Sequence, residues 1–351
     1  MSAPQPVGWV VAGAGWVASD HMAPAIAASP GSRVVAVVDR DLAAAERLAA
    51  RFSGARACRD VAGAAAVPGA QVVYVATPNS AHRPVVEDAA AAGLAVLCEK
   101  PLAASLSDAR ELVAACAAAG IFAATAYDQR FHPAHRTAAR LVASGALGTV
   151  TAVRIVYGCW LPPDWVPENH PGHDNWRADP ARAGGGAYVD LAPHGIDLVG
   201  ALLGEDLVRA TTLQQQRVQD YPVDDGSVLV GTTASGVLVS IHNSYNTADT
   251  LPRRRLEIVG TRAQLVATNT MGQDAGGRLE LIDAADGTSA PVPFDTGLSP
   301  FTAQVQAVEA ALTDPGRTAW PYPMDRDLRL LGLMHDALPV TTSDDFEELL
   351  R

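Results

Sequence analysis

Short apolar runs alternate with helical patterns through the first 127 residues. This alternation is typical of βαβ units, in which crossover helices join parallel strands. The expected strands are Trp9–Ala12, Val34–Val38, Val72–Ala76, Ala95–Cys98 and Phe122–Tyr127. The expected helices are Trp16–Ala28, Leu42–Phe52, Arg83–Ala92 and Leu106–Ala119. The pattern therefore predicts an α/β fold whose first domain, residues 1–128, is a doubly wound parallel sheet.

The pattern changes after Arg130, where a series of alternating strands begins. Strands are expected at Val150–Tyr157 and at 208–215, 226–232, 236–245, 254–260, 263–267 and 278–282. Helices are expected at Pro133–Ser144, Ala187–Leu203, Ala303–Leu312 and Asp325–Leu338. Because short turns such as Gly260-Thr261-Arg262 join several of the strands, they predict an antiparallel sheet. Residues 129–351 then form an α+β domain, whose last helix could pack back on the first domain.

Length and composition agree with two globular domains. The chain has 351 residues, of which 48% are hydrophobic and 18% charged, and one domain usually takes about 100–200 residues. No apolar run is long enough to span a membrane. The first residues, Met1–Pro6, lack both the basic and the apolar part of an export signal, so we expect a cytoplasmic protein without membrane contact.

Cysteine and histidine spacing argues against a metal site. The four cysteines lie 18 to 43 residues apart without a CxxC pair, and we expect plain buried thiols at Cys58, Cys98, Cys116 and Cys159. The segment His170-x-x-His173-Asp174 superficially resembles a metal site. It lies on a proline- and glycine-rich loop without a third firm ligand, so we expect no metal there.

The charged residues exclude one class of partner and single out one side chain. A net charge of −12 would repel a phosphate backbone, and the only basic run is Arg253–Arg255, so nucleic-acid binding is not expected. Of the 26 basic residues, only Lys100 is a lysine. Arginine stays protonated at every relevant pH, whereas lysine can exchange a proton. Lys100 is therefore a candidate for proton chemistry, the alternative being a surface lysine retained by chance.

A glycine motif follows the first expected strand. Residues 13–18 read G-x-G-x-x-A, in which Gly13 permits a tight turn and Gly15 lets the backbone approach a pyrophosphate. The next strand ends at Asp39, 24 residues after Gly15, where a carboxylate can bind an adenosine ribose. Asp39 would repel a 2′-phosphate, which favours NAD, although Arg40 leaves NADP possible. The alternative is a glycine turn that binds no ligand.

Two further strands end in polar residues at the edge where open α/β sheets bind ligands. The third strand runs into Thr77-Pro78-Asn79 and His82, and the fourth into Glu99-Lys100-Pro101. For Thr77 and Asn79, a role in the turn itself explains the residues as well as cofactor binding does. For His82, a role as a polar residue at the start of a helix is a stronger explanation than cofactor binding. The expected cofactor-binding residues are Gly13, Gly15, Trp16, Val17, Asp39, Arg40, Thr77, Asn79, His82, Glu99 and Lys100.

A second constellation begins with three glycines at 184–186. Asp190, His194 and Asp197 follow at spacings of four and three residues, which places them on one face of a helix. Such an arrangement lets Asp190 orient the imidazole of His194, the side chain best suited to proton transfer at neutral pH. A surface or capping pair is the alternative, but a glycine triplet indicates close approach of a ligand or another chain.

The segment before these glycines is rich in aromatic residues. Aromatic faces suit the C–H faces of a sugar ring, and an arginine can bind hydroxyls or a carboxylate. A proline-rich lid at a subunit contact is an equal alternative, and Tyr127 and Arg130 either line the cleft or tie the domains together. The expected substrate-binding residues are Lys100, Tyr127, Tyr157, Trp160, Trp176, Arg177, Asp190 and His194.

The order of these motifs resembles the Gfo/Idh/MocA family, named after glucose–fructose oxidoreductase and inositol dehydrogenase. The likeness covers the whole chain, from G-x-G-x-x-A through E-K-P to G-G-G-x-x-x-D-x-x-x-H-x-x-D, and departs from the usual family pattern at Tyr188 and Ala192. It implies a Rossmann domain followed by an open, mostly antiparallel sheet. It also implies catalysis by Lys100, Asp190 and His194, with hydride transfer between NAD(H) and a carbinol carbon of a sugar, cyclitol or polyol.

The roles expected in the oxidising direction follow from this resemblance. His194 would take the hydroxyl proton, Asp190 would orient the imidazole and Lys100 would polarise the oxygen, although Lys100 and His194 could exchange roles. The alternatives are a redox-neutral hydrolase, lyase or epimerase that uses bound NAD, and a cofactor-sensing protein without activity. The exposed face of the second sheet predicts a homodimer or homotetramer.

Overall fold

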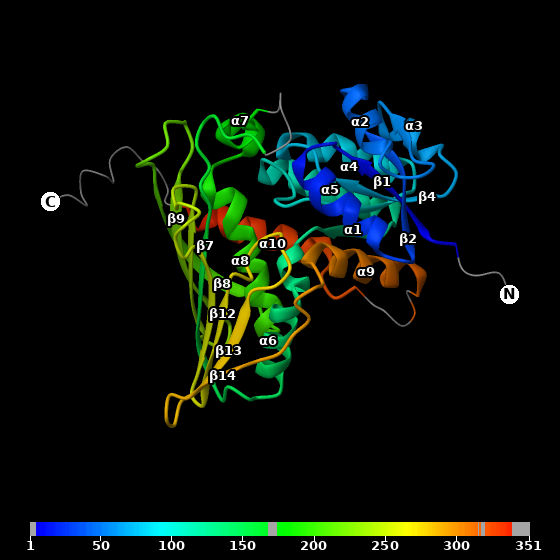
Figure 1. Ribbon diagram of the computed structural model, residues 1–351. Coiled ribbons are helices and arrows are strands. Elements are labelled where there is room, and N and C mark those ends of the chain that lie inside the picture. The colour runs from blue at the N-terminus through cyan, green and yellow to red at the C-terminus, as the bar shows by residue number, and fades with distance from the viewer. Residues whose placement is uncertain (1–4, 168–173, 315, 317–319, 339–351) are drawn as a thin grey trace.

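A computed structural model describes residues 5–167, 174–314, 316 and 320–338, which form two sheets with helices packed on them (Figure 1). The N-terminal sheet has six parallel strands in the order β3-β2-β1-β4-β5-β6. Its strands are β1 (Val7–Ala12), β2 (Ser32–Val38), β3 (Arg56–Cys58), β4 (Ala70–Val75), β5 (Ala95–Cys98) and β6 (Ala123–Thr125). This arrangement confirms the predicted doubly wound Rossmann sheet.

Helices cover both faces of the N-terminal sheet, which explains why its central strands are almost wholly apolar. One face packs against η1 (Val17–Met22), α1 (Ala23–Ala28), α2 (Leu42–Ala49) and α9 (Pro300–Thr313). The other packs against α3 (Val61–Ala65), α4 (His82–Ala91), α5 (Leu106–Ala119) and the start of α10 (Met324–Asp336). The first crossover begins with a π-helical turn, because Pro24 has no N–H to continue α-type bonding back to Asp20.

The C-terminal sheet has eight strands in the order β14-β13-β12-β11-β7-β10-β9-β8. Only β10 and β7 pair in parallel, so the sheet is mostly antiparallel, and it is open at β14 and β8. Its strands are β7 (Val150–Gly158), β8 (Leu207–Gln215), β9 (Gly226–Thr233), β10 (Leu238–Ser244), β11 (Arg254–Gly260), β12 (Ala263–Thr268), β13 (Arg278–Asp283) and β14 (Ser289–Pro291). The fold class implied by the resemblance is confirmed.

Among the described residues, helices lie on one face of this sheet only. Figure 1 shows α6 (Pro133–Ala143) and α8 (Ala187–Leu203) between the C-terminal sheet and the N-terminal part of the chain. The main C-terminal hydrophobic core forms between α8 and the inner side of the sheet. Gly204 ends α8 in a left-handed conformation with φ 72°, as a C-terminal glycine does. α8 therefore stands as a rigid element between the two sheets.

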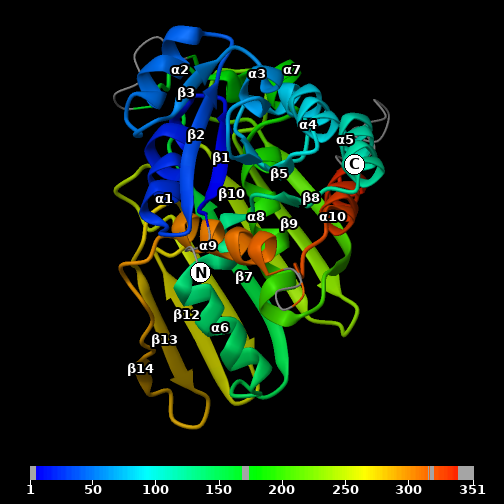
Figure 2. The same ribbon diagram turned by 90° about the vertical axis from the view of Figure 1, so that its right-hand side faces the viewer.

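The last two helices return to the N-terminal sheet, α9 on one face and α10 on the other (Figure 2). Short segments complete the connections: η2 (Asn79–Ala81), η3 (Asp128–Phe131), η4 (Trp176–Ala178) and α7 (Pro180–Ala183). Cys98 and Cys116 are buried thiols, whereas Cys58 and Cys159 are only half-buried, and all four are unpaired. In the part of the chain that the structure describes, no helix combines the length and the apolar character needed to cross a bilayer.

Candidate active site

A cavity lies where the carboxyl ends of the parallel strands face α8 and β7. Most of the predicted site residues meet there. From the N-terminal side it is lined by Gly15, Trp16, Val17, Thr77, Asn79, His82, Glu99 and Lys100. From the C-terminal side it is lined by Tyr157, Trp160, Trp176, Arg177, Asp190 and His194. Gly13, Asp39, Arg40 and Tyr127 are not among its lining residues.

The glycine turn after β1 has the shape that a dinucleotide requires. Gly13 has φ 99°, and a Cβ there would lie 2.7 Å from the backbone of Ala76, so only glycine fits. Beside Gly15 the space is open, because a Cβ built there meets nothing within 4 Å. The turn then runs directly into η1. The open backbone at a helix start fits a pyrophosphate.

Asp39 at the end of β2 is held next to this turn. Its Oδ2 accepts a hydrogen bond from the backbone N–H of Ala14 at 2.9 Å, and its Oδ1 accepts one from Asp41 at 2.9 Å. Arg40 is exposed. The carboxylate therefore lies beside the glycine turn, where an adenosine ribose would be bound.

The loops after β4 and β5 are tied together by His82. This buried side chain places Nδ1 3.0 Å from the carbonyl oxygen of Pro101 and Nε2 2.9 Å from that of Thr77. Burial lowers the pKa of His82 to about 4, so the ring is neutral at physiological pH. Asn79 donates to the carbonyl oxygen of Ala183 at 2.8 Å, which links the loop to α7. These contacts support the structural alternatives for His82 and Asn79.

Glu99 is buried at the end of β5, below the loop that carries Lys100. Its Oε1 accepts a hydrogen bond from the Tyr74 hydroxyl at 2.6 Å, and its Oε2 accepts one from the Lys100 backbone at 3.2 Å. Burial raises the pKa of Glu99 to about 7. Glu99 thus fixes the backbone of Lys100.

Lys100 is paired with Asp190. Its Nζ lies 2.5 Å from Oδ1 of Asp190 and 3.0 Å from the carbonyl oxygen of the same residue, and the two side chains are 11% and 17% exposed. Oδ2 of Asp190 accepts from the Tyr245 hydroxyl at 2.7 Å and lies 3.5 Å from Nε of Arg177. Burial would raise the pKa of Asp190, but the charges of Lys100 and Arg177 hold it well below its usual range.

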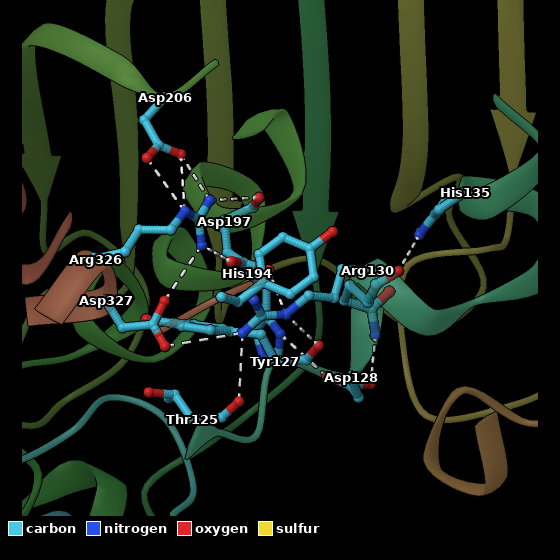
Figure 3. A network of polar contacts seen from close by, with 12 residues as sticks. Thr125, Tyr127, Asp128, Arg130, His135, His194, Asp197, Asp206, Arg326 and Asp327 are labelled. Carbon is cyan, nitrogen blue, oxygen red and sulfur yellow. Dashed lines mark hydrogen bonds and ion pairs between the residues drawn. The ribbon is translucent and has the colours of Figure 1, made fainter. Parts of the chain in front are cut away.

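His194 is paired with Asp128 and not with Asp190, so that part of the sequence prediction is wrong. Nδ1 of His194 lies 3.3 Å from Oδ1 of Asp128, which belongs to η3, directly after the last parallel strand (Figure 3). Asp190 shares a face of α8 with His194, but its carboxylate is already occupied by Lys100 and Tyr245. The His194 contact and a 2.6 Å hydrogen bond from Gln129 lower the pKa of Asp128 against the effect of burial.

The second acid of α8, Asp197, belongs to a buried network beyond the cavity (Figure 3). Its Oδ1 accepts from Arg326 at 2.6 Å, and its Oδ2 lies 3.3 Å from Nε of Arg130. The ring of Tyr127 lies 5.1 Å from the guanidinium of Arg130. Contrary to the prediction of a substrate contact, Tyr127 thus packs in the network that joins η3, α8 and α10.

Aromatic rings form the C-terminal wall of the cavity. The Tyr157 ring lies 5.5 Å from that of His194, and the guanidinium of Arg177 lies 4.5 Å from the Trp176 ring. Trp165, which the sequence analysis did not select, lies 5.8 Å from Trp16 across the cavity. These rings give the cavity apolar faces beside its charged groups.

The histidine-rich loop cannot be placed, because His170 and His173 lie outside the described residues. Asp174 is paired with Arg182. Within residues 5–167, 174–314, 316 and 320–338, no three histidine, cysteine or acidic side chains are grouped as metal ligands.

Sequence reasoning missed Asp128, Tyr245 and Arg254. Asp128 follows the last parallel strand, and the rule that ligands bind at the carboxyl ends of such strands could have found it. Tyr245 and Arg254, which also lines the cavity, lie at a strand end and a strand start in the C-terminal sheet. No local spacing connects those two residues to the rest of the site.

Comparison with known proteins agrees with this fold. Residues 7–127 match a family model described as "Oxidoreductase family, NAD-binding Rossmann fold", and residues 135–266 match one described as "GFO/IDH/MocA C-terminal domain". The chain is 29% identical to 1,5-anhydro-D-fructose reductase of Ensifer adhaerens over 85% of this chain and 88% of that protein. It is 32% identical to D-xylose 1-dehydrogenase (NADP(+)) 2 of Haloferax volcanii over 78% of this chain and 79% of that protein.

A solved relative extends the comparison to three dimensions. The structure of aldose-aldose oxidoreductase from Caulobacter crescentus, complexed with glycerol, superposes with a TM-score of 0.81 at 25% identity, covering 95% of this chain and 97% of that one. Sequence and fold therefore agree along nearly the whole length. The chain belongs to the GFO/IDH/MocA family of NAD(P)-dependent sugar oxidoreductases.

Proposed function

We propose that the protein transfers a hydride between NAD(H) and a secondary alcohol or ketone of a sugar, cyclitol or related polyol. One observation carries the proposal: Lys100 and His194, each paired with its own carboxylate, line the same cavity as the open backbone beside Gly15. A proton-transfer group and an oxygen-polarising group thus lie at the end of the sheet where nicotinamide is expected.

In the oxidising direction His194 accepts the hydroxyl proton. Asp128 favours the imidazolium that forms and, through its contact with Nδ1, leaves Nε2 as the atom that takes the proton. A nicotinamide cofactor bound in this cavity would supply the acceptor for the hydride of the carbinol carbon. In the reducing direction the same imidazolium returns the proton to the alkoxide.

Lys100 polarises the substrate oxygen and stabilises its negative charge. Asp190 positions the ammonium by contacts from both its carboxylate and its carbonyl oxygen, and Glu99 fixes the backbone that carries it. The role of Asp190 is thus to hold Lys100, while Asp128 serves His194. Donors fixed in a half-buried site stabilise developing charge more than water does.

NAD is the preferred cofactor in this proposal. The Asp39 carboxylate beside the glycine turn accepts hydrogen bonds from ribose hydroxyls and repels a 2′-phosphate. Arg40 is exposed, and a 2′-phosphate bound by it would still face Asp39. Trp16 and Val17 line the cavity next to the expected pyrophosphate.

A substrate screen tests the proposal. Purified protein is assayed at 340 nm with NAD(H) and NADP(H) against sugars, inositols, 1,5-anhydro sugars and their keto forms. We expect turnover with at least one of them. In Lys100→Arg we expect loss of turnover with unchanged NADH binding by fluorescence titration, because the planar guanidinium of arginine does not replace the compact ammonium of lysine and cannot release a proton. Wild-type turnover in Lys100→Arg contradicts the assignment.

A redox-neutral reaction is the second candidate. The solved relative from Caulobacter crescentus is named an aldose-aldose oxidoreductase, a name that places a sugar on both sides of the reaction. In such a reaction Lys100 and His194 would act in both half-reactions, because the bound cofactor would be reduced and then reoxidised within one catalytic cycle. Product formation without a net change at 340 nm supports this candidate, and a stoichiometric change supports the dehydrogenase.

A further inference from the structure

Arg254 faces the substrate side of the cavity, although the proposed reaction gives it no role. It is the first residue of β11, pairs in register with Tyr157 of β7, and lines the cavity. Its guanidinium carbon lies 6.0 Å from the centre of the Tyr157 ring, and that ring lies 5.5 Å from the ring of His194. The guanidinium is therefore one aromatic ring away from the proton acceptor.

The other charged groups of the cavity have partners. Lys100 and Arg177 share Asp190, His194 contacts Asp128, and Asp174 is paired with Arg182. The residues on either side of Arg254 in the sequence are also paired, Arg253 with Asp249 and Arg255 with Glu257.

Arg254 itself makes no hydrogen bond or ion pair with any residue that the structure describes, and its Nε is buried without a partner. A buried donor without an acceptor is unfavourable, and arginine N–H groups match carboxylate and phosphate oxygens best. An anionic ligand at this point would satisfy the guanidinium.

A second hollow adjoins the cavity at Arg254. It measures roughly 600 Å³ and contains three arginines and two aspartates, Arg253, Arg254, Arg278, Asp249 and Asp274. Gly272 lies beside the guanidinium with φ 139°, and a Cβ there would come within 2.3 Å of Nη1. Because residue 272 is a glycine, no side chain displaces the Arg254 guanidinium from its position between the cavity and the hollow.

We infer that Arg254 forms an anion subsite, which binds a carboxylate or a phosphate carried by the sugar away from the reacting carbinol. The inference rests on the proposed function and narrows its substrate class to acidic or phosphorylated sugars and polyols. The net charge of −12 does not attract such a ligand at long range. The preference therefore arises from contact with Arg254, because charges beyond about 8 Å are largely screened at physiological salt.

Matched substrates test the inference. D-Glucose is compared with D-glucuronate and D-glucose 6-phosphate, and D-galactose with D-galacturonate, both by kcat/KM and by calorimetric binding to the NADH-loaded protein. We expect at least one anionic member to exceed its neutral parent by about tenfold or more, because a hydrogen-bonded charge pair contributes at least that factor. Comparison of the carboxylate substrates with the phosphate substrate shows which of the two anions Arg254 binds better.

Substitutions at Arg254 and Arg255 distinguish a loss of anion binding from a loss of folding. Arg254→Gln should lower kcat/KM and affinity for the anionic member at least about tenfold more than for its neutral parent. Arg254→Lys should retain part of the anionic preference, and the exposed control Arg255→Gln should change the values for neither member. A wild-type protein without anionic preference overturns the inference, as does an Arg254→Gln variant that weakens both members equally. If no substrate changes the absorbance at 340 nm, the proposed function fails, while the binding data still decide the role of Arg254.

Discussion

At the scale of single residues, Lys100 and His194 are each held by a different carboxylate. Asp190 is paired with Lys100, and Asp128 is paired with His194. Lys100 could be found from the sequence because it is the only lysine among 26 basic residues. Asp128 could not be paired with His194, because the two are 66 residues apart and meet only when η3 packs against α8. The local sequence spacing identified Asp190 and His194 as site residues but paired His194 with the wrong carboxylate.

The variant Asp128→Asn tests this pairing. We expect kcat to fall by about 10²–10⁴-fold, because a neutral amide no longer stabilises the imidazolium of His194. The acid limb of the kcat/KM profile should move to lower pH for the same reason, while NADH affinity stays unchanged. A pH profile like that of the wild type would mean that Asp128 does not act through His194.

At the scale of elements, long periodic segments were predicted well and short ones were missed. The predicted bounds Leu106–Ala119 and Ala187–Leu203 are those of α5 and α8. β3 and β14 have three residues each, too few to show a period of two. The parallel pairing of β10 with β7 was also missed, because strand order is decided by packing and not by local pattern.

α8 is anchored one turn beyond His194 by the buried contacts of Asp197 with Arg326 and Arg130. Removing one partner of a buried ion pair leaves the other charges uncompensated. We expect Asp197→Ala to lower the free energy of unfolding by about 3–5 kcal/mol, measured by urea denaturation. Asp206→Ala is the control, because Asp206 contacts the same Arg326 but is 33% exposed, and its effect should be smaller. Equal effects would show that the Asp197 contacts do not anchor the helix.

Asp327 belongs to the same network through its contacts with Arg130 and Arg326, and it makes the stability depend on pH. Burial raises the pKa of Asp327 from 3.8 to about 7, so the folded protein holds a proton that the unfolded chain loses near pH 4. Between about pH 4 and pH 7 the folded state binds more protons, so this carboxyl makes the protein less stable as the pH rises. The Tm of the wild type should therefore fall relative to that of Asp327→Asn from pH 5 to pH 7, and a constant difference would contradict the raised pKa.

At the scale of the whole molecule, α10 joins the two sheets, because its start packs on the N-terminal sheet and its later residues pack in the C-terminal core. α9 packs on the opposite face of the N-terminal sheet and contacts η3. The site forms between the sheets, with Asp128 in η3 and His194 in α8. The division at residue 128, the cytoplasmic location and the oligomeric state remain predictions.

Self-association through the C-terminal sheet can be tested on its outer face. The pairing of β8, β9 and β10 places four exposed apolar side chains on that face, Leu213, Val228, Val230 and Leu238. We expect a dimer or tetramer by light scattering, because such a patch is unfavourable in water. The double variant Val230→Arg/Leu238→Arg should shift the protein toward the monomer. A wild-type monomer at micromolar concentration would contradict the prediction.

The most direct test of the account follows the hydride itself. Protein loaded with NADH deuterated at C4 is mixed with the ketone form of an active sugar, and the product is analysed by NMR after a single turnover. The account predicts deuterium on the new carbinol carbon with the wild type, and a rate at least about 10²-fold lower with His194→Asn. Absence of deuterium from the product, or transfer by His194→Asn at the wild-type rate, would contradict it.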